Sequence, residues 1–389
     1  MTDKRRLTGR AQVPVRDGPA PAALTGMDVV SAFGHGTKPL LDNVVPGRAA
    51  FGPVGRFDVA DRRVGVAATM PGSPVLLDGL VRVVEGACDE AGLSTMERAE
   101  TPLLLAVHGD PGLARAGRDE RPGRSAGALA VALAERCGLA SALRAYTSAC
   151  VAASTAVADG GSLLARGAER VVVAAGYLVE PDQFALFDAG RALATDGQVR
   201  PFSARRKGLL LGDGVAAVVL ESADALRRRG ATPLARLSGW GRAGDAYHVC
   251  RPDPTGAGLA RAIGDALRRG GIAAEDVGYL NAHGSGTPHS DAAESNAVRR
   301  AFGDRAIPIS STKSVVGQAL EAAGLVELIV TALALHHGEL PVNAGFLEPD
   351  AQCPLDVIVD APRPTTARYA LSLNSAFGGA NTALLVAAP

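Results

Sequence analysis

Cys150 is the residue of this sequence best placed for covalent chemistry. Small residues precede it in the run Tyr146-Thr147-Ser148-Ala149, and an alanine-rich helix is expected over Ser154–Gly167. The partial positive charge and free N–H groups of a helix start stabilise a thiolate and lower its pKa. The same N–H groups can donate to an oxyanion when the sulfur carries an acyl group. The alternative is a small buried hydrophobic residue, and this segment alone does not decide between the two.

Three further segments carry residues that suit acyl chemistry. His283 stands at the end of an expected strand, beside Gly284, where it could act as a general acid–base or donate to a bound thioester. A histidine tied into a turn is the alternative. Lys313 ends another expected strand, and a buried pairing with Glu327 would be both structural and electrostatic. The glycine turn around Phe377 indicates by itself only that backbone passes close to something.

Two glycine-rich runs resemble nucleotide-binding motifs in letters only. The residues Gly212–Ala217 match a dinucleotide fingerprint, but an expected strand follows these glycines where the motif requires a helix. The run Gly284-Ser285-Gly286-Thr287 lacks the lysine of a phosphate loop. We therefore expect no nucleotide and no other cofactor.

Composition narrows the class of protein. The chain has 389 residues, 47% of them hydrophobic, and its 40 basic and 40 acidic residues cancel. Nothing in this balance favours nucleic acid or a membrane surface as a partner. The five cysteines are scattered, which indicates reduced thiols in a cytoplasmic protein and neither disulfides nor a metal site. No membrane-spanning helix is expected, and residues 1–20 are interpreted as a flexible basic tail without the apolar core of a secretory signal.

Short apolar runs alternate with helical stretches along the whole chain. The runs have the length of buried strands and are Pro102–Val107, Val171–Gly176, Ala216–Glu221, Gly278–Ala282, Ile307–Ser311, Tyr369–Leu373 and Thr382–Ala387. The expected helices are Val75–Ala91, Ser154–Gly167, Gly256–Gly270, Asp291–Phe302 and Ala322–His337. This alternation predicts an α/β protein. The segment Ser222–Ala235 is the nearest candidate boundary, so we expect halves at 21–228 and 229–389.

The four segments together resemble the β-ketoacyl-[acyl carrier protein] synthase family. The resemblance rests on the cysteine segment, the loop His283-Gly284-Ser285-Gly286-Thr287, the turn Ser311-Thr312-Lys313-Ser314 and the Phe377 turn, in that order. It implies a thiolase fold, a five-layered α/β/α/β/α arrangement of two similar halves. It also implies a homodimer, or a heterodimer with a ketosynthase-like subunit.

The resemblance assigns a role to each candidate residue. Cys150 would take an acyl group from the phosphopantetheine thioester of an acyl carrier protein. His283, Lys313 and Glu327 would match the first histidine and the supporting lysine and glutamate of the family. The N–H groups of Cys150 and Phe377 would form the oxyanion hole, with Phe377 also acting as a gate.

The sequence departs from the family at several positions. Gln318 stands where condensing members carry a second histidine, and an amide donates hydrogen bonds but cannot become cationic. The segment between His108 and Tyr146 is shorter than usual, and the Phe377 turn is one residue short. The cluster Arg205, Arg206 and Lys207 adds positive charge, which we interpret as a carrier-docking surface or as a solvated basic turn.

Three functions follow from these matches and departures. The first is a synthase that loads an acyl chain onto Cys150 and forms a carbon–carbon bond in polyketide or fatty-acid-type biosynthesis. The second is a related acyltransferase or cyclase that does not elongate the chain, because Gln318 replaces a histidine used in decarboxylation. The third is a non-catalytic partner subunit resembling a chain-length factor, against which the retained Cys150, His283, Lys313 and Glu327 argue.

Overall fold

A single mixed sheet runs through the molecule. The computed structural model describes residues 21–119 and 122–389, so the expected tail at 1–20 lies outside the described residues. Within these ranges the sheet order is β6-β5-β7-β8-β1-β9-β16-β15-β10-β11-β13, with the short β2 paired to β1. The strands of the first half are β1 (Ala22–Ser31), β2 (Gly34–His35), β5 (Leu103–Ala106), β6 (Ala142–Tyr146), β7 (Arg170–Tyr177) and β8 (Gly214–Glu221). Those of the second half are β9 (Ala235–Gly244), β10 (Val277–Asn281), β11 (Pro308–Ser310), β13 (Asp356–Val357), β15 (Tyr369–Ala376) and β16 (Ala380–Ala387).

The two halves of the sheet repeat one pattern. In the first half β1, β8 and β7 are antiparallel neighbours, and β7, β5 and β6 are parallel. In the second half β9, β16 and β15 are antiparallel, and β15, β10 and β11 are parallel. With the short β2 and β13 set aside, each half therefore places its five main strands in the order third, second, fourth, fifth, first. The halves join where β1 pairs with β9 through Ala22–Leu24. This repeat is what the duplicated architecture predicts, while the boundary at 228/229 stays a prediction.

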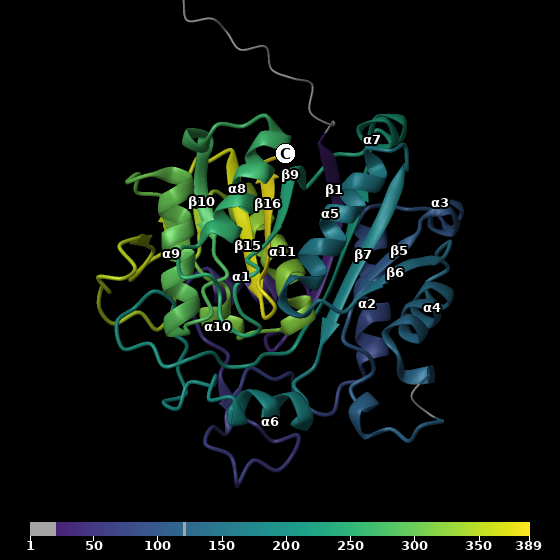
Figure 1. Ribbon diagram of the computed structural model, residues 1–389. Helices are drawn as coiled ribbons and strands as arrows, with labels where there is room; N and C mark the ends of the chain where they lie inside the picture. Colours follow the sequence, from purple (N-terminus) through teal and green to yellow (C-terminus); the bar gives the residue numbers. More distant parts are fainter. Residues whose placement is uncertain (1–20, 120–121) are drawn as a thin grey trace, which may run out of the picture.

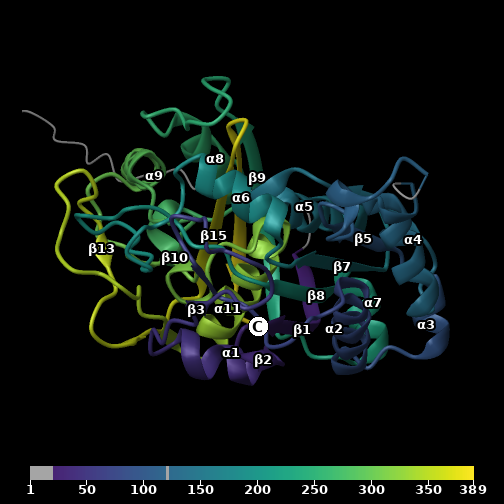
Figure 2. The ribbon, with the colours of Figure 1, turned by 90° about the horizontal axis from the view of Figure 1, so that it is seen from below.

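Helices cover both faces of each half-sheet. In Figures 1 and 2 α5 and α11 lie between the halves, with α2 and α4 outside the first and α8 and α9 outside the second. The helices are α1 (Thr37–Val44), α2 (Leu76–Glu90), α3 (Thr95–Glu100), α4 (Ala126–Arg136), α5 (Ala152–Leu164), α6 (Pro181–Ala189), α7 (Ala223–Arg229), α8 (Ala257–Gly270), α9 (Pro288–Phe302), α10 (Lys313–Val316) and α11 (Ala323–His337). Two small ribbons pair β3 (Gly52–Pro53) with β4 (Val66–Ala67), and β12 (Glu339–Leu340) with β14 (Arg363–Pro364). The layers are those of the α/β/α/β/α arrangement.

The central helices α5 and α11 are apolar on nearly all sides because both halves of the sheet pack against them. The stretch Leu320–His337 has a mean hydropathy of 1.4 over 18 residues, enough by length and composition to cross a membrane. However, 83% of that stretch is buried inside the protein, as in the core helix of a globular protein. By contrast α8 is amphipathic, with Ala262, Ile263 and Ala266 buried against the sheet.

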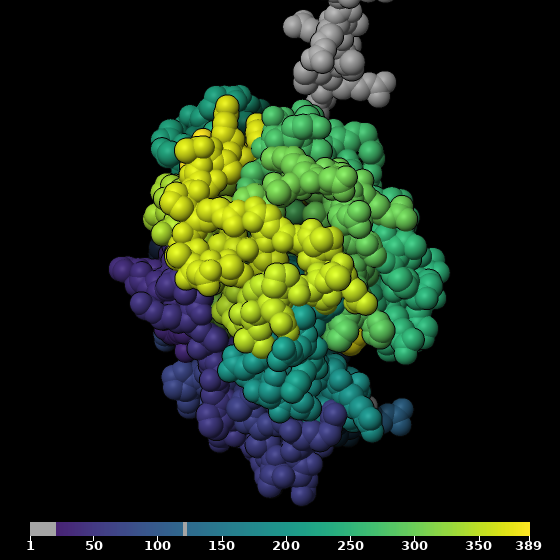
Figure 3. Space-filling model, turned by 90° about the vertical axis from the view of Figure 1, so that its left-hand side faces the viewer, coloured from purple at the N-terminus to yellow at the C-terminus, as the bar shows by residue number. Residues whose placement is uncertain are grey.

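Backbone hydrogen bonds outside the sheet also join the two halves. The N–H of Ala50 donates to the carbonyl of Val315, and that of Val342 donates to the carbonyl of Val45. Figure 3 shows this intermixing, with the yellow C-terminal residues forming much of one face above the purple N-terminal segment. The α/β prediction and all seven expected strands are confirmed.

Candidate active site

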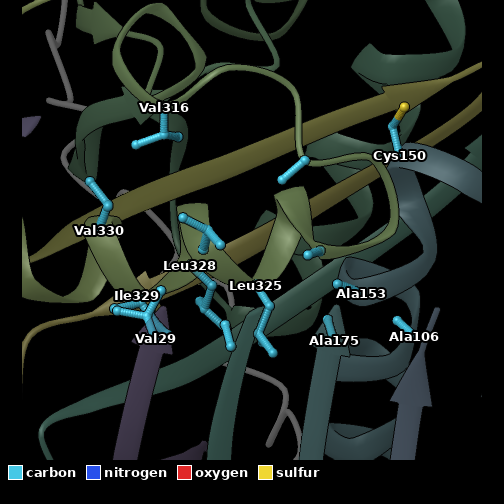
Figure 4. Close-up of a cluster of buried hydrophobic side chains, with 14 of the residues drawn as sticks. Val29, Ala106, Cys150, Ala153, Ala175, Val316, Leu325, Leu328, Ile329 and Val330 are labelled. Carbon is cyan, nitrogen blue, oxygen red and sulfur yellow. The ribbon is translucent and has the colours of Figure 1, made fainter. Parts of the chain in front are cut away.

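Cys150 lies in a 3₁₀ turn, Ala149–Val151, which connects the end of β6 to the start of α5. The preceding residue, Ala149, has a φ of 49°, a left-handed conformation that costs energy for any residue with a Cβ. The thiol is buried, with 7% of the residue exposed. Figure 4 shows its sulfur pointing away from Ala153, Ala175 and Ala106 of the apolar core. The turn therefore points the sulfur away from these three alanines at the helix start.

The electrostatics of Cys150 correct the expectation of a lowered pKa. Burial, aided by the carboxylate of Glu321 and opposed by Lys313, raises the pKa of the thiol to about 12. The helix start is in place, but burial and a neighbouring negative charge outweigh the positive influences. In the resting protein the sulfur is therefore a thiol, which accepts a hydrogen bond from Nε2 of Gln318 at 3.4 Å.

His283 is held as a neutral hydrogen-bond donor. The backbone N–H of Ser375 donates to its Nδ1 at 3.2 Å, so the ring proton resides on Nε2. Burial, with help from Lys313, lowers the pKa of the imidazole well below its ordinary value. Both carboxylate oxygens of Glu294 anchor the loop by accepting from the N–H groups of His283 and Gly284, each at 2.7 Å.

Lys313 and Glu327 form a buried ion pair at 2.5 Å, with 1% and 2% of their side chains exposed. Nδ2 of Asn374 donates to the other oxygen of Glu327 at 2.5 Å. Ser154, one turn after Cys150, donates to Oδ1 of Asn374. The ion pair is thus connected through Asn374 to the helix that carries the nucleophile.

Gly324 allows this connection because a side chain there would collide with it. A Cβ on Gly324 would lie 2.1 Å from Oγ of Ser154 and 2.8 Å from Oδ1 of Asn374. The close approach of α11 to α5 therefore requires glycine at this position.

A second group of polar side chains near Cys150 differs from the ion pair, because one polar atom of each side chain lacks a hydrogen-bond partner among the described residues. Among the residues that the structure describes, the buried Tyr177 hydroxyl, Oε1 of Gln318 and Oε2 of Glu321 have no hydrogen-bond partner. Oε1 of Glu321 lies 3.7 Å from Nδ1 of His108, whose side chain is 60% exposed. Proximity to Glu321 raises the pKa of His108. We call Tyr177, Gln318 and Glu321 the unpaired side of the site, and His283, Lys313, Glu327 and Asn374 the paired side.

Phe377 stands at the tip of the turn between β15 and β16. It is 56% exposed and stacks on Phe187 of α6, with ring centroids 6.0 Å apart. The N–H of the next residue, Gly378, donates to the carbonyl of Val249. An exposed ring at a turn fits a gate, and its part in an oxyanion hole stays a prediction.

The expected docking cluster needs correction at Arg206. This guanidinium is 3% exposed and bonds to Asp350 and to the carbonyls of Ser203 and Pro288, so it is structural and unable to meet a partner. Arg205 and Lys207 are 74% and 52% exposed and face Glu348 and Asp196. Of the three residues in this cluster, only Arg205 and Lys207 are accessible for docking.

Sequence reasoning had no role for Glu294, Asn374, Tyr177 or Glu321. Glu294 had a readable signal, since it lies in the first two turns of the helix that follows the His283 loop. The other three become visible only from their neighbours. In the described ranges, no group of three His, Cys, Asp or Glu side chains could hold a metal ion.

Comparison with known proteins agrees with this geometry. Residues 91–225 match the N-terminal domain of β-ketoacyl synthases, and residues 234–347 match the C-terminal domain. The β-ketoacyl synthase of Burkholderia phymatum STM815 superposes with a TM-score of 0.88 at 28% identity, covering 95% of this chain and 100% of that one. The ishigamide ketosynthase/chain length factor gives a TM-score of 0.86 at 28% identity with the same coverage.

Curated relatives match over a shorter region. Nodulation protein E of Rhizobium meliloti is 41% identical over 242 residues, which cover 61% of this chain and 60% of the relative. The ketoacyl synthase alpha subunit of the tetracenomycin polyketide synthase from Streptomyces glaucescens is 38% identical over 249 residues, 62% of this chain and 58% of the relative. The 3-oxoacyl-[acyl-carrier-protein] synthase 2 of Staphylococcus aureus is 34% identical over 249 residues, 62% of each chain. The matched region thus spans about three fifths of these relatives.

The fold and the structural matches define a thiolase-fold protein. The chain belongs to the β-ketoacyl synthase family.

Proposed function

We propose that this protein accepts an acyl chain from a carrier-protein thioester onto Cys150 and then forms a carbon–carbon bond as a β-ketoacyl synthase. The observation that carries the proposal is the convergence at Cys150 of groups from distant segments. Gln318 contacts the sulfur, and the buried Lys313–Glu327 pair is linked to the same helix through Asn374 and Ser154. A purely structural subunit has no need for this assembly.

Each group has a defined part in the loading step. The sulfur attacks the thioester carbonyl, and the N–H groups of Cys150 and Phe377 would stabilise the oxyanion. His283 serves as a neutral donor, because its Nδ1 is already an acceptor and its proton is on Nε2. Lys313 contributes positive charge near the sulfur, and Glu327 balances it.

The elongation step depends on Gln318. Decarboxylation of a malonyl thioester builds negative charge on the thioester oxygen, which needs donors. The amide of Gln318 already faces the sulfur and can supply a hydrogen bond but no positive charge. This observation favours a second candidate function, a transferase or cyclase that acts on the Cys150-bound acyl group without elongating it.

Intact-protein mass spectrometry tests loading and elongation separately. Incubation with acyl-carrier protein should add the acyl mass to the wild type and none to Cys150→Ala. Subsequent malonyl-carrier protein should release carbon dioxide and an elongated product if the synthase function holds. An acyl mass retained by Cys150→Ala would overturn the site assignment, and loading without carbon dioxide release would leave the non-elongating function.

The partners follow from the same proposal. The Staphylococcus aureus relative is named as a synthase of 3-oxoacyl-[acyl-carrier-protein]. We propose that an acidic acyl carrier protein donates the acyl group here as well. Arg205 and Lys207 would steer it, so changing both to Ala should slow loading most at low salt. Equal loading rates at all salt concentrations would exclude this surface.

We also propose dimerisation in the cytoplasm. Among the described strands, β6 is the edge strand at the first-half end of the sheet, and its residue Leu143 is 52% exposed. An open sheet edge with an exposed apolar residue suits a second subunit.

A further inference from the structure

Cys150 needs a proton acceptor that the paired side does not supply. Its sulfur is a buried thiol, so acylation requires a group that removes the proton as the carbonyl is attacked. His283 cannot take the proton at Nε2, because that nitrogen already carries one and Nδ1 accepts from Ser375. Lys313 is an ammonium paired with Glu327, whose oxygens accept from Lys313 and Asn374.

Glu321 has a free oxygen in the required region. Oε2 is buried and without a hydrogen-bond partner among the described residues, although a buried carboxylate oxygen is costly to leave unpaired. The 3₁₀ turn that carries it, Leu320–Ala322 (η5), packs against the turn that carries Cys150 and against β7, which carries Tyr177. Gln318, which bonds to the sulfur, lies three residues earlier in the same segment.

Backbone strain marks the same two positions. Leu320 has a φ of 37° immediately before Glu321, as Ala149 has a φ of 49° immediately before Cys150. Neither residue is glycine, so both turns hold unfavourable conformations that the surrounding structure must impose. The strained pair places a nucleophile and a carboxylate on facing turns.

A path for the proton to solvent is also present. Oε1 of Glu321 faces Nδ1 of His108 at 3.7 Å, and His108 is 60% exposed. The charged groups that act on the thiol are Glu321, Lys313 and Glu327, and Glu321 has the largest effect of the three. Glu321 therefore lies on a turn packed against that of Cys150 and also faces an exposed titratable group.

We propose that Glu321 is the general acid–base partner of Cys150, an inference that rests on the proposed loading of Cys150. The carboxylate accepts the thiol proton through one bridging water, because no hydrogen bond joins Glu321 to the sulfur in the resting structure, and the sulfur bonds to the thioester carbonyl carbon. The bond from that carbon to the pantetheine sulfur then breaks, and Glu321 returns the proton to the departing thiolate. The acyl group has moved between two sulfurs, and no proton or electron is left over.

The substitution Glu321→Gln separates this role from a purely electrostatic one by the sign of its effect. A carboxylate that only repels the thiolate would, on removal, leave Cys150 easier to ionise and faster to load. A proton acceptor would, on removal, slow loading by about a hundredfold or more. The measurement is the rate of acyl-enzyme formation from acyl-carrier protein, by rapid quench and intact mass spectrometry between pH 6 and 9.

Two further variants complete the experiment. Glu180→Gln is the matched control. This half-buried carboxylate also acts on Tyr177 but is paired with Arg115, so the variant should load at the wild-type rate. Glu321→Ala leaves space for a small acid, so added formate should restore part of its loading rate. Glu321→Gln that loads at or above the wild-type rate, or Glu321→Ala without rescue by formate, would overturn the role of Glu321. Acyl mass on Cys150→Ala would instead overturn the proposed function itself.

Discussion

The two sides of Cys150 use buried polar residues in opposite ways. On the paired side the Lys313 ammonium, both oxygens of Glu327 and the Asn374 amide all have partners. On the unpaired side the Tyr177 hydroxyl, the Gln318 carbonyl and one oxygen of Glu321 have none among the described residues. Polar groups satisfied within the protein hold a structure in place, while buried groups left free are available to substrate or protons. We therefore expect substitutions on the paired side to affect stability first, and those on the unpaired side to affect activity first.

The largest effect on stability is expected for Lys313→Met. Methionine has a similar length but no charge, so Glu327 would remain buried without its counter-ion. Breaking a buried pair from one side costs roughly 3–5 kcal/mol. Denaturant unfolding measures the change, and the double variant Lys313→Met, Glu327→Gln should recover part of it by removing the second charge. A single variant as stable as the wild type would contradict the structural part of the comparison.

On the unpaired side Gln318→His should alter activity while stability stays nearly constant. If Gln318 limits decarboxylation, a histidine donor should raise carbon dioxide release from malonyl-carrier protein by about a hundredfold, equivalent to ~3 kcal/mol. Acyl loading on Cys150 should not change, and it serves as the internal control. Wild-type protein that already elongates at ordinary synthase rates would show instead that an amide suffices.

The sequence predicts more of the fold than of the candidate site. All seven predicted strands and all five predicted helices are present, because their apolar runs are continuous and well bounded. Among the described strands of five or more residues, β1, β6 and β9 were not predicted. β9 includes Arg236, Ser238 and Gly239, and β6 is an edge strand with exposed residues, so neither has the apolar pattern of a buried strand.

The site shows the same division. Cys150 and Lys313 could be selected from residue type and local spacing, and Gln318 from the resemblance to the family. Glu321 and Tyr177 could not be selected, because only the structure shows that their buried oxygens have no hydrogen-bond partner among the described residues. The prediction of a lowered pKa for Cys150 was wrong for a related reason. The helix start is visible in the sequence, whereas the burial of the thiol and the approach of Glu321 are not.

Glu294 gives the paired side a dependence on pH. Burial and nearby Asp291 raise the pKa of Glu294 to about 7, although its bonds to the His283 loop and the charge of Lys313 lower it. The folded protein therefore binds more protons than the unfolded chain between pH 4.5, the ordinary pKa of a glutamate, and about pH 7. Stability from this group rises as the pH falls from 8 through 7 toward 4.5, by about 3 kcal/mol in full and about 2 kcal/mol down to pH 5.5. In Glu294→Gln this contribution should disappear, which unfolding curves at pH 8 and 5.5 would detect. An unchanged pH dependence would contradict the assignment.

The smallest effect on stability is expected for Tyr177→Phe, and a matched residue elsewhere makes it informative. Tyr177 and Tyr279 are both buried, but the Tyr279 hydroxyl shares a hydrogen bond of 2.8 Å with Ser310, whereas the Tyr177 hydroxyl has no partner in the described structure. Removing a satisfied hydroxyl costs about 1 kcal/mol, while removing an unsatisfied one relieves a desolvation penalty of similar size. Tyr279→Phe should therefore destabilise the free protein slightly, and Tyr177→Phe should leave it equally stable or more stable.

If the Tyr177 hydroxyl serves the acyl substrate, Tyr177→Phe should raise the KM for acyl-carrier protein or slow turnover, which Tyr279→Phe should not do. Equal losses of stability in both variants, with unchanged kinetics, would mean that Tyr177 has a partner in solution and belongs with the paired side.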